Sequence, residues 1–247
     1  MKIKTIKKTK KIIFISLFAF ILLPIFSQSE KNEEFESLFK SGIYKKNGVE
    51  LPFRTAHFNG NDKSEPVLVV FMHGHSAFGK DNSNQLTKET LKNIVRYVQK
   101  NSVNAFVLAP QCDESSKWTE IPDVLNSFYS EFKEEHGCSK ILLSGDSMGG
   151  CGVWLLIDKF PFLAEKAVVL GAAPFKPNIK NFTKTKIFAV CGENDDFGSI
   201  KRIEPVIKKI NEMNGSAHIK ILKNLDHVQT CMNGMSEDVL EFFFGRE

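Results

Sequence analysis

The sequence lacks a CxxC pair, an internal repeat, a low-complexity linker and any break that would mark a domain boundary. Without closely spaced cysteines a zinc site is not expected, and we predict no other metal and no organic cofactor. With 247 residues, of which 42% are hydrophobic and 25% charged, the chain has the composition of one packed globular domain.

Cysteine is sparse and widely spaced, at Cys112, Cys138, Cys151, Cys191 and Cys231. In an exported protein one or two disulfides can form, but an odd number leaves at least one thiol unpaired unless it bridges to another chain. The alternative is that most of these side chains are small buried hydrophobic groups. Spacing alone leaves the pairing open.

Acidic residues are absent from the first 27 positions, which hold six lysines. The basic head, residues 1–11, is followed by a fifteen-residue apolar run over residues 12–26. This pattern is typical of a secretory signal peptide, because a membrane-spanning helix needs about 20 apolar residues. We predict a signal peptide over residues 1–28, with the cut between Ser27 and Ser29. An uncleaved N-terminal anchor is the alternative.

The predicted mature domain, residues 29–247, has a different charge balance from the whole chain. The full sequence carries 33 basic and 29 acidic residues, a net charge of +4, whereas the part after residue 27 carries 27 and 29, a net charge of −2. The basic excess of the full sequence therefore comes from the predicted signal peptide, and it indicates export to the periplasm or the medium. Binding to nucleic acid and stable membrane insertion after signal cleavage are not expected.

Apolar runs alternate with amphipathic segments from residue 66 onward. Apolar strands are predicted at 66–74, 104–110, 140–145, 166–172, 185–192 and 218–223, and helices at 88–100, 121–137, 148–160, 199–215 and 235–245. Strands that are apolar throughout and alternate with helices predict an α/β fold, with a mostly parallel sheet covered on both faces. Upstream, Asn47-Gly48 predicts an antiparallel hairpin at one edge of that sheet.

Reactive side chains follow the carboxyl ends of several predicted strands, where open parallel sheets place their active groups. Ser147 lies in Gly145-Asp146-Ser147-Met148-Gly149, between a strand and a helix. The two glycines permit a sharp turn that exposes the hydroxyl of a nucleophilic serine. A plain turn serine is the alternative. We expect Asp146, beside it, to have a surface role, with tuning of the local charge as the alternative.

A base and an acid follow later strands in the order that a serine nucleophile needs. His227 can accept the serine proton, and Asp195 can orient its imidazole, with Asp196 as a competing acid. The backbone N–H of Met148 and the N–H of His75 are the predicted oxyanion donors.

Five segments carry a resemblance to a known family: FMHGHSAFGKDN, LAPQCDESSKW, LSGDSMGG, CGENDDFGSI and LDHVQT, which span residues 71–230. They resemble the α/β-hydrolase fold, in particular small esterases such as carboxylesterases, phospholipase-like proteins and bacterial polyester or feruloyl esterases. The resemblance implies a Ser-His-Asp triad and places the segment with Gln111 and Trp118 near the substrate cleft. We expect both side chains to bind the substrate, with ordinary packing as the alternative for Trp118. Two departures are Ser76, where glycine is frequent, and Asp-Phe-Gly-Ser at residues 196–199, where Val-Pro often follows the acid.

The sequence thus predicts a secreted serine hydrolase that cleaves a small-molecule carboxylic ester through an acyl-enzyme. A peptidase of the prolyl-oligopeptidase type shares the fold and the triad, but it usually carries a propeller domain for which we find no segment. A phospholipase or depolymerase would differ only in its acyl partner. A binding protein that has lost catalysis on a hydrolase scaffold is the alternative of another class.

Overall fold

The computed structural model describes residues 32–61 and 64–245, and the predicted signal peptide lies outside these residues. The chain divides into two units, residues 1–38 and residues 39–247. The described part of the first unit is helical over residues 32–37. Within the described ranges, no helix is both long and apolar enough to cross a membrane.

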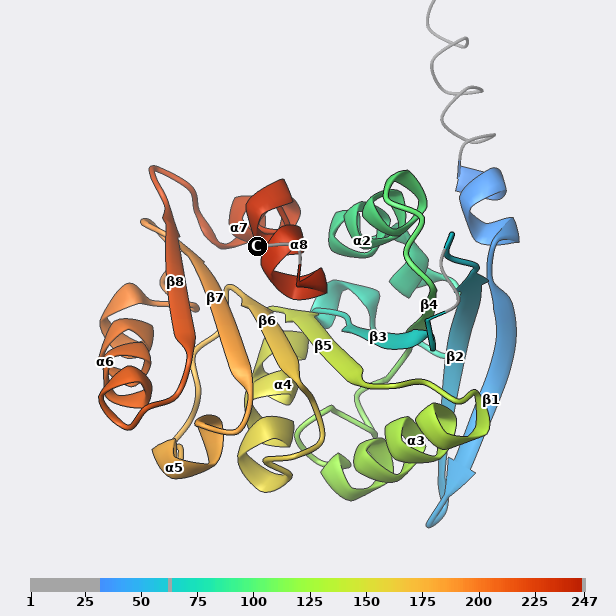
Figure 1. Ribbon diagram of the computed structural model, residues 1–247, viewed down its shortest axis with the longest axis horizontal. Helices are drawn as coiled ribbons and strands as arrows, with labels where there is room; N and C mark the ends of the chain where they lie inside the picture. Colours follow the sequence, from blue (N-terminus) through green and yellow to red (C-terminus); the bar gives the residue numbers. More distant parts are fainter. Residues whose placement is uncertain (1–31, 62–63, 246–247) are drawn as a thin grey trace, which may run out of the picture. The chain divides into compact units, whose positions relative to one another are not determined.

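The second unit is built on one eight-stranded sheet with the order β1-β2-β4-β3-β5-β6-β7-β8 (Figure 1). The strands are β1 Lys40–Lys46, β2 Val49–Phe58, β3 Val67–Met72, β4 Ala105–Pro110, β5 Ile141–Asp146, β6 Lys166–Leu170, β7 Lys186–Gly192 and β8 Ala217–Leu222. Strands β1 and β2 run antiparallel to their neighbours, and all other pairs are parallel. The predicted mostly parallel sheet is confirmed.

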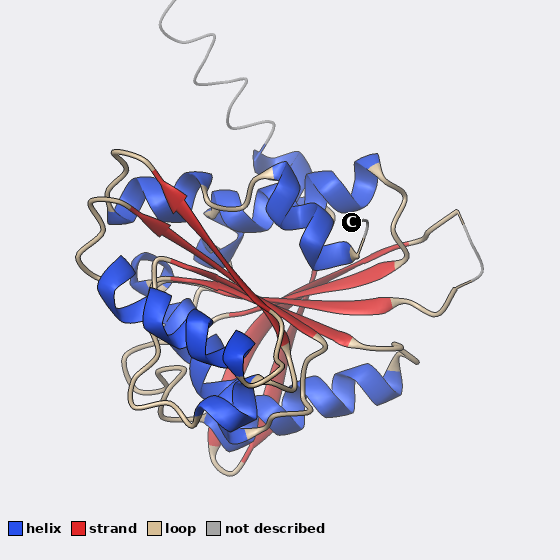
Figure 2. Ribbon diagram, turned by 60° about the vertical axis from the view of Figure 1, so that its left-hand side comes forward, coloured by secondary structure: helices blue, strands red, loops and turns tan. Residues whose placement is uncertain are grey.

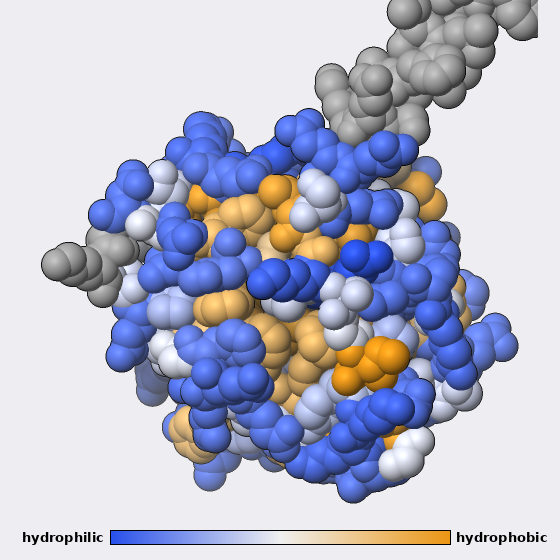
Figure 3. Space-filling model, turned by 90° about the vertical axis from the view of Figure 1, so that its right-hand side faces the viewer, coloured by the Kyte–Doolittle hydropathy of each residue, from blue (hydrophilic) through white to orange (hydrophobic). Residues whose placement is uncertain are grey.

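The antiparallel hairpin at the edge is also confirmed. Asn47 and Gly48 form its turn with φ of 53° and 78°, the positive values that a two-residue turn between twisted strands requires. The hairpin pairs through β2 with β4 rather than with β3, the next strand in the chain. Figure 3 views the molecule from the β1 side, where apolar surface lies among hydrophilic side chains, and Ile43 of β1 is 57% exposed.

Helices cover both faces of the twisted sheet (Figure 2). Helices α2, α7 and α8 lie on one face, and α3, α4, α5 and α6 on the other (Figure 1). Their bounds are α2 Glu89–Lys100, α3 Pro122–Glu135, α4 Met148–Lys159, α5 Ile179–Phe182, α6 Ile200–Glu212, α7 His227–Asn233 and α8 Glu237–Phe244. The short helices α5 and α7 are not in the sequence prediction. The central strands β5 and β6 are buried along their whole length, which explains why most of their residues are apolar, with Ser144, Asp146 and Lys166 as buried polar exceptions.

The strand register brings the carboxyl ends of the parallel strands to one edge. Met72 pairs with Gly145, Asp146 with Leu170, and Gly192 with Leu222. The loops that follow β3, β5, β7 and β8 therefore begin side by side, and these are the loops that carry the predicted reactive residues.

Candidate active site

Ser147 occupies a sharp turn between β5 and α4. Its φ is 52° and its ψ −117°, a conformation that a residue with a side chain rarely adopts. The neighbouring glycines make this turn possible: a Cβ on Gly149 would lie 1.8 Å from the carbonyl oxygen of Met72, and one on Gly145 would lie 2.5 Å from the backbone of Gly149. The predicted glycine-flanked turn is therefore present, and its backbone leaves no room for side chains at either glycine.

The hydroxyl of Ser147 lies at the head of a chain of hydrogen bonds. Its Oγ is 2.8 Å from Nε2 of His227. On the other side of the imidazole, Nδ1 is 3.1 Å from Oδ1 and 3.0 Å from Oδ2 of Asp195. We call these three residues the Ser–His–Asp cluster. An imidazole held between a hydroxyl and a carboxylate can accept the hydroxyl proton and remain stabilised as a cation.

Asp195, and not its exposed neighbour Asp196, faces the imidazole. The Asp195 side chain is buried, and its Oδ1 also accepts the backbone N–H groups of Phe197 at 2.9 Å and Gly198 at 2.7 Å. These donors satisfy the buried carboxylate and hold its orientation. A Cβ on Gly171 would lie 3.0 Å from Oδ2 of Asp195, so this glycine gives the pair the space that it needs.

His227 is positioned by a helix that the sequence analysis missed. It is the first residue of α7, directly after the N-cap Asp226. The Asp226 carboxylate accepts the N–H of Gln229 at 2.8 Å, and Oε1 of Gln229 accepts the N–H of Asp226 at 3.1 Å. This reciprocal pair is a capping box, and the spacing Asp-x-x-Gln is the sequence signal that could have revealed the helix.

Two backbone segments bring N–H groups close to Ser147. Met148 begins α4, and the first N–H groups of a helix have no acceptor within it. His75 begins the short 3₁₀ helix η1, His75–Ala77. A Cβ on Gly74 would lie 3.3 Å from Cβ of Ser147, so the loop over residues 73–82, here called the Gly74 loop, passes directly beside the serine.

Gln111 lies behind the Gly74 loop and not on the surface of a cleft. Its side chain is buried, donates to the carbonyl of Ala77 at 3.1 Å and to Asp81 at 3.0 Å, and accepts the N–H of Asn82 at 2.6 Å. All of its polar groups are thus used to hold the loop. In this structure Gln111 has no exposed surface with which to touch a substrate, which corrects the expectation of direct contact.

Trp118 requires the same correction. It is 0% exposed, and its indole N–H donates to the carbonyl of His73 at 2.9 Å. His73 is itself buried, and burial lowers its pKa to about 4. The neutral ring donates from Nδ1 to the carbonyl of Gly74 at 2.7 Å and accepts the N–H of Cys112 at Nε2, at 3.1 Å. Trp118 and His73 therefore stiffen the start of the Gly74 loop.

Asp146 is buried, so the prediction of a surface role was wrong. It is 5% exposed and lies directly before Ser147 at the end of β5. The hydroxyl of Thr90 is 3.5 Å from its Oδ2. Burial raises the pKa of this carboxyl group to about 6, because the ionised form loses the hydration that it has in water.

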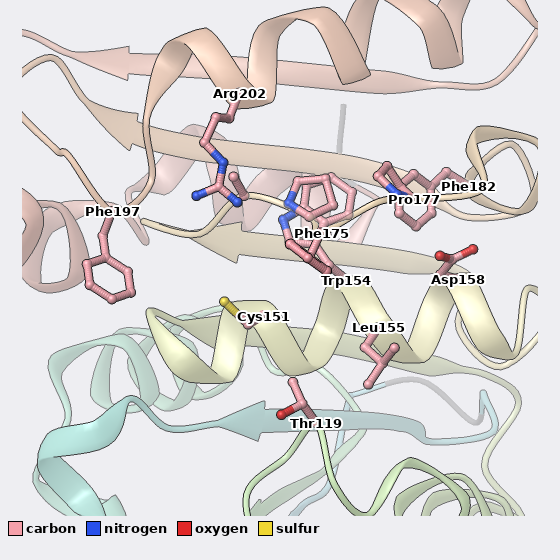
Figure 4. A pocket seen from close by; sticks show the side chains of 12 residues that line it. Thr119, Cys151, Trp154, Leu155, Asp158, Phe175, Pro177, Phe182, Phe197 and Arg202 are labelled. Atoms are coloured by element: carbon pink, nitrogen blue, oxygen red, sulfur yellow. The ribbon is translucent and has the colours of Figure 1, made fainter.

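A cavity of about 440 Å³ is lined by residues that include Phe197 and Cys151 (Figure 4), and both of these are close to the Ser–His–Asp cluster. It begins beside Phe197, whose ring lies 5.3 Å, centroid to centroid, from that of His227. Cys151, which also lines it, donates its backbone N–H to the carbonyl of Ser147 at 3.0 Å. A group bound at Ser147 can therefore extend into this space. The cavity could not be predicted from the sequence, because its walls come from loops and helices that are far apart in the chain.

No family model matches the chain, and no curated protein matches it in sequence. Solved structures match it in fold. A thermostable esterase aligns with a TM-score of 0.75 and 22% identity over 86% of this chain, which spans 64% of that protein. Est1E from Butyrivibrio proteoclasticus aligns with a TM-score of 0.62 and 11% identity, over 83% of this chain and 98% of that one.

A feruloyl esterase module from Clostridium thermocellum, complexed with sinapinate, is similar at a TM-score of 0.62 and 13% identity, over 83% of this chain and 87% of the module. An α/β serine hydrolase without a lid, from Xanthomonas campestris, is a further neighbour. The structure therefore has the α/β-hydrolase fold, as the sequence resemblance implies, and its structural neighbours are esterases and other serine hydrolases.

Proposed function

We propose that this chain is an exported serine hydrolase that cleaves carboxylic esters through an acyl-enzyme on Ser147. The observation that carries the proposal is the unbroken hydrogen-bonded path from Ser147 Oγ through His227 to the buried carboxylate of Asp195, with a 2.8 Å step between hydroxyl and imidazole. A structural serine has no need of an aligned base with its own buried orienting group. The backbone strain at Ser147 favours the same interpretation.

In the proposed reaction the Ser147 oxygen forms a bond to the ester carbonyl carbon while Nε2 of His227 takes the hydroxyl proton. When the tetrahedral intermediate collapses, the bond to the alcohol oxygen breaks and His227 returns that proton to the leaving alcohol. Water then attacks the acyl-enzyme with His227 again as the base, and the acid is released. Asp195 keeps the imidazole in the tautomer that presents a bare Nε2 to the serine.

The N–H groups of Met148 and His75 are the proposed donors to the oxyanion. Both begin helical segments beside Ser147, where backbone N–H groups point away from the helix. Gln111 and Trp118 act through the Gly74 loop, since their hydrogen bonds fix the segment that carries His75. No step in this scheme calls for a metal or an organic cofactor.

Labelling with a fluorophosphonate probe tests the nucleophile, followed by kinetics on short-chain, aryl and lipid esters and on peptides. We expect one adduct per chain, and the adduct should be absent in Ser147→Ala. The control is Ser139→Ala, which should still be labelled, because Ser139 is an exposed serine at the opposite end of β5. Labelling that survives in Ser147→Ala would overturn the assignment. Faster cleavage of peptides than of esters would favour the peptidase alternative, and a lack of both turnover and labelling would favour a binding protein.

The neighbouring acids provide a matched pair of variants for the same assay. Asp195→Asn should lower kcat by about three to four orders of magnitude, because the amide holds the wrong imidazole tautomer and cannot stabilise its cation. Asp196→Asn should leave kcat within about twofold, since that side chain is exposed and lies outside the hydrogen-bonded path. Equal losses in the two variants would contradict the role assigned to Asp195.

A further inference from the structure

The cavity beside the Ser–His–Asp cluster has aromatic walls. Trp154, Phe175 and Phe182 line it together with Phe197. The indole of Trp154 and the ring of Phe182 pack at 5.0 Å and 46°, and the indole N–H is used by the carbonyl of Ala172 at 2.9 Å. Trp154 and Phe182 are nearly fully buried. The ring surface that a bound group can contact therefore comes mainly from Phe175 and Phe197, which are 79% and 65% exposed. A space of about 440 Å³ with such walls suits a flat aromatic group.

Arg202 is the one cation among the described residues that line this cavity, while Lys176 lies outside it, over the ring of Phe175 at 5.3 Å. Arg202 extends from α6 into the cavity, and its guanidinium lies between Phe197 and the aromatic walls, on the side of Cys151 (Figure 4). Its positive charge lowers the pKa of the Cys151 thiol, against the larger raising effect of burial. The guanidinium is therefore close to the helix that begins at the nucleophile.

Arg202 has no acidic partner in the part of the chain that the structure describes. None of the ion pairs found there includes it. Asp158 lines the same cavity, but it accepts the backbone N–H of Asn178 and the side-chain amide of Asn181, both at 3.2 Å. In Figure 4 this acid lies at the end of the cavity away from Phe197. The planar, permanently charged guanidinium thus faces the space where a substrate group would bind. A carboxylate is the group that best matches it, because the two can form paired hydrogen bonds.

We propose that the cavity binds the part of an ester substrate that carries an aromatic ring and a free carboxylate, with the carboxylate paired to Arg202. The aromatic ring of the substrate lies against the exposed ring of Phe175, and its free carboxylate meets the guanidinium of Arg202. The substrate class is therefore an ester of an aromatic compound that has a further carboxylic acid. Turnover of such an ester rests on the proposed function, whereas binding of the aromatic carboxylate does not.

Calorimetric titration of Ser147→Ala tests binding without catalysis. The probes are 3-phenylpropionate and the neutral 3-phenylpropionamide, which have nearly the same shape. We expect the carboxylate to bind about tenfold more tightly than the amide, as for one charge-assisted pair. Arg202→Gln in the same background should remove this difference. Lys201→Gln should keep the difference, because Lys201 is an exposed neighbour on α6 that does not line the cavity. Equal binding of the two probes, no binding of either, or a preference that survives in Arg202→Gln would overturn the proposal.

Turnover of 4-acetoxybenzoate against 4-acetoxybenzamide gives a second readout, in the chain with its native Ser147. The charged ester should be preferred about tenfold in kcat/KM, mostly through KM, and Arg202→Gln should abolish the preference. Arg202→Lys should keep only part of it, because a lysine cannot form the two-pronged contact. If carboxylate binding persists while no ester is cleaved, the proposed function fails and the ligand assignment stands. If esters are cleaved with no preference for charge, the ligand assignment fails alone.

Discussion

At the scale of single residues, the buried carboxyl group of Asp146 makes stability depend on pH. Burial raises its pKa from 3.8 to about 6 in the folded chain. Below pH ~4 the group is protonated in both the folded and the unfolded chain, so its burial does not lower the free energy of unfolding. Between pH ~4 and ~6 it ionises in the unfolded chain first, so the folded state loses stability as the pH rises, and above pH ~6 the loss is constant.

Asp146→Asn removes this pH-dependent loss. The free energy of unfolding of the variant, relative to the unsubstituted chain, should rise by up to about 3 kcal/mol between pH 4 and pH 7. Urea unfolding at both pH values measures it. Asp196→Asn is the control, since this exposed carboxyl group keeps its contact with water on folding. A difference between Asp146→Asn and the unsubstituted chain that does not change with pH would contradict the assigned cost of burial.

At the scale of elements, the capping box of α7 links local helix stability to the position of His227, the proposed base. Asp226→Ala removes the acceptor of the Gln229 N–H, which should cost about 1 kcal/mol. Because His227 is the next residue, we also expect a fall in kcat that exceeds any change in KM. Thermal unfolding and steady-state kinetics on one ester measure the two effects.

Ser199→Ala is the matched control for the cap, since Ser199 is the N-cap of α6 but makes no side-chain capping hydrogen bond. It should change neither the midpoint of unfolding nor kcat appreciably. If Asp226→Ala loses stability but keeps full kcat, the cap has a purely structural role and His227 is held by other contacts.

These same elements show what local sequence can and cannot predict. The hairpin at Asn47-Gly48 and the turn at Ser147 follow from the conformational freedom of a few residues, so their sequence signals suffice. Helix α7 has only seven residues, too few for an apolar period to stand out, and it depends on its cap. The sequence resemblance selects Gln111 and Trp118 but does not give the direction of a side chain, and both side chains are buried.

At the scale of the whole molecule, the alternation of apolar strands and helices was enough to predict a parallel sheet and hence an edge where Ser147, Asp195 and His227 lie close together. The order of the strands within the sheet could not be predicted from this alternation. Strand β4 lies between β2 and β3 because the hairpin pairs with it, and this choice depends on packing across the whole sheet. The cavity beside the cluster escaped prediction for the same reason, since its walls combine α4, α6 and the loops after β6 and β7.

The state of the cysteines provides a test of the whole fold, because the sequence left open whether they form disulfides and the structure does not pair them. All five are free thiols, and Cys112, Cys138 and Cys191 are buried. Burial raises the pKa of Cys138 and of Cys191 to about 11, so these thiols stay protonated and slow to react near neutral pH.

Ellman's reagent should therefore detect five thiols in the unfolded protein, and at most the two partly exposed ones, Cys151 and Cys231, should react rapidly in the folded protein. A reductant should leave the midpoint of thermal unfolding unchanged, because no disulfide constrains the unfolded chain. Protein recovered from the periplasm is the stringent sample, since disulfides form there wherever geometry allows. Three thiols or fewer after unfolding, together with a midpoint lowered by reductant, would mean that the chain forms a disulfide that this fold does not contain.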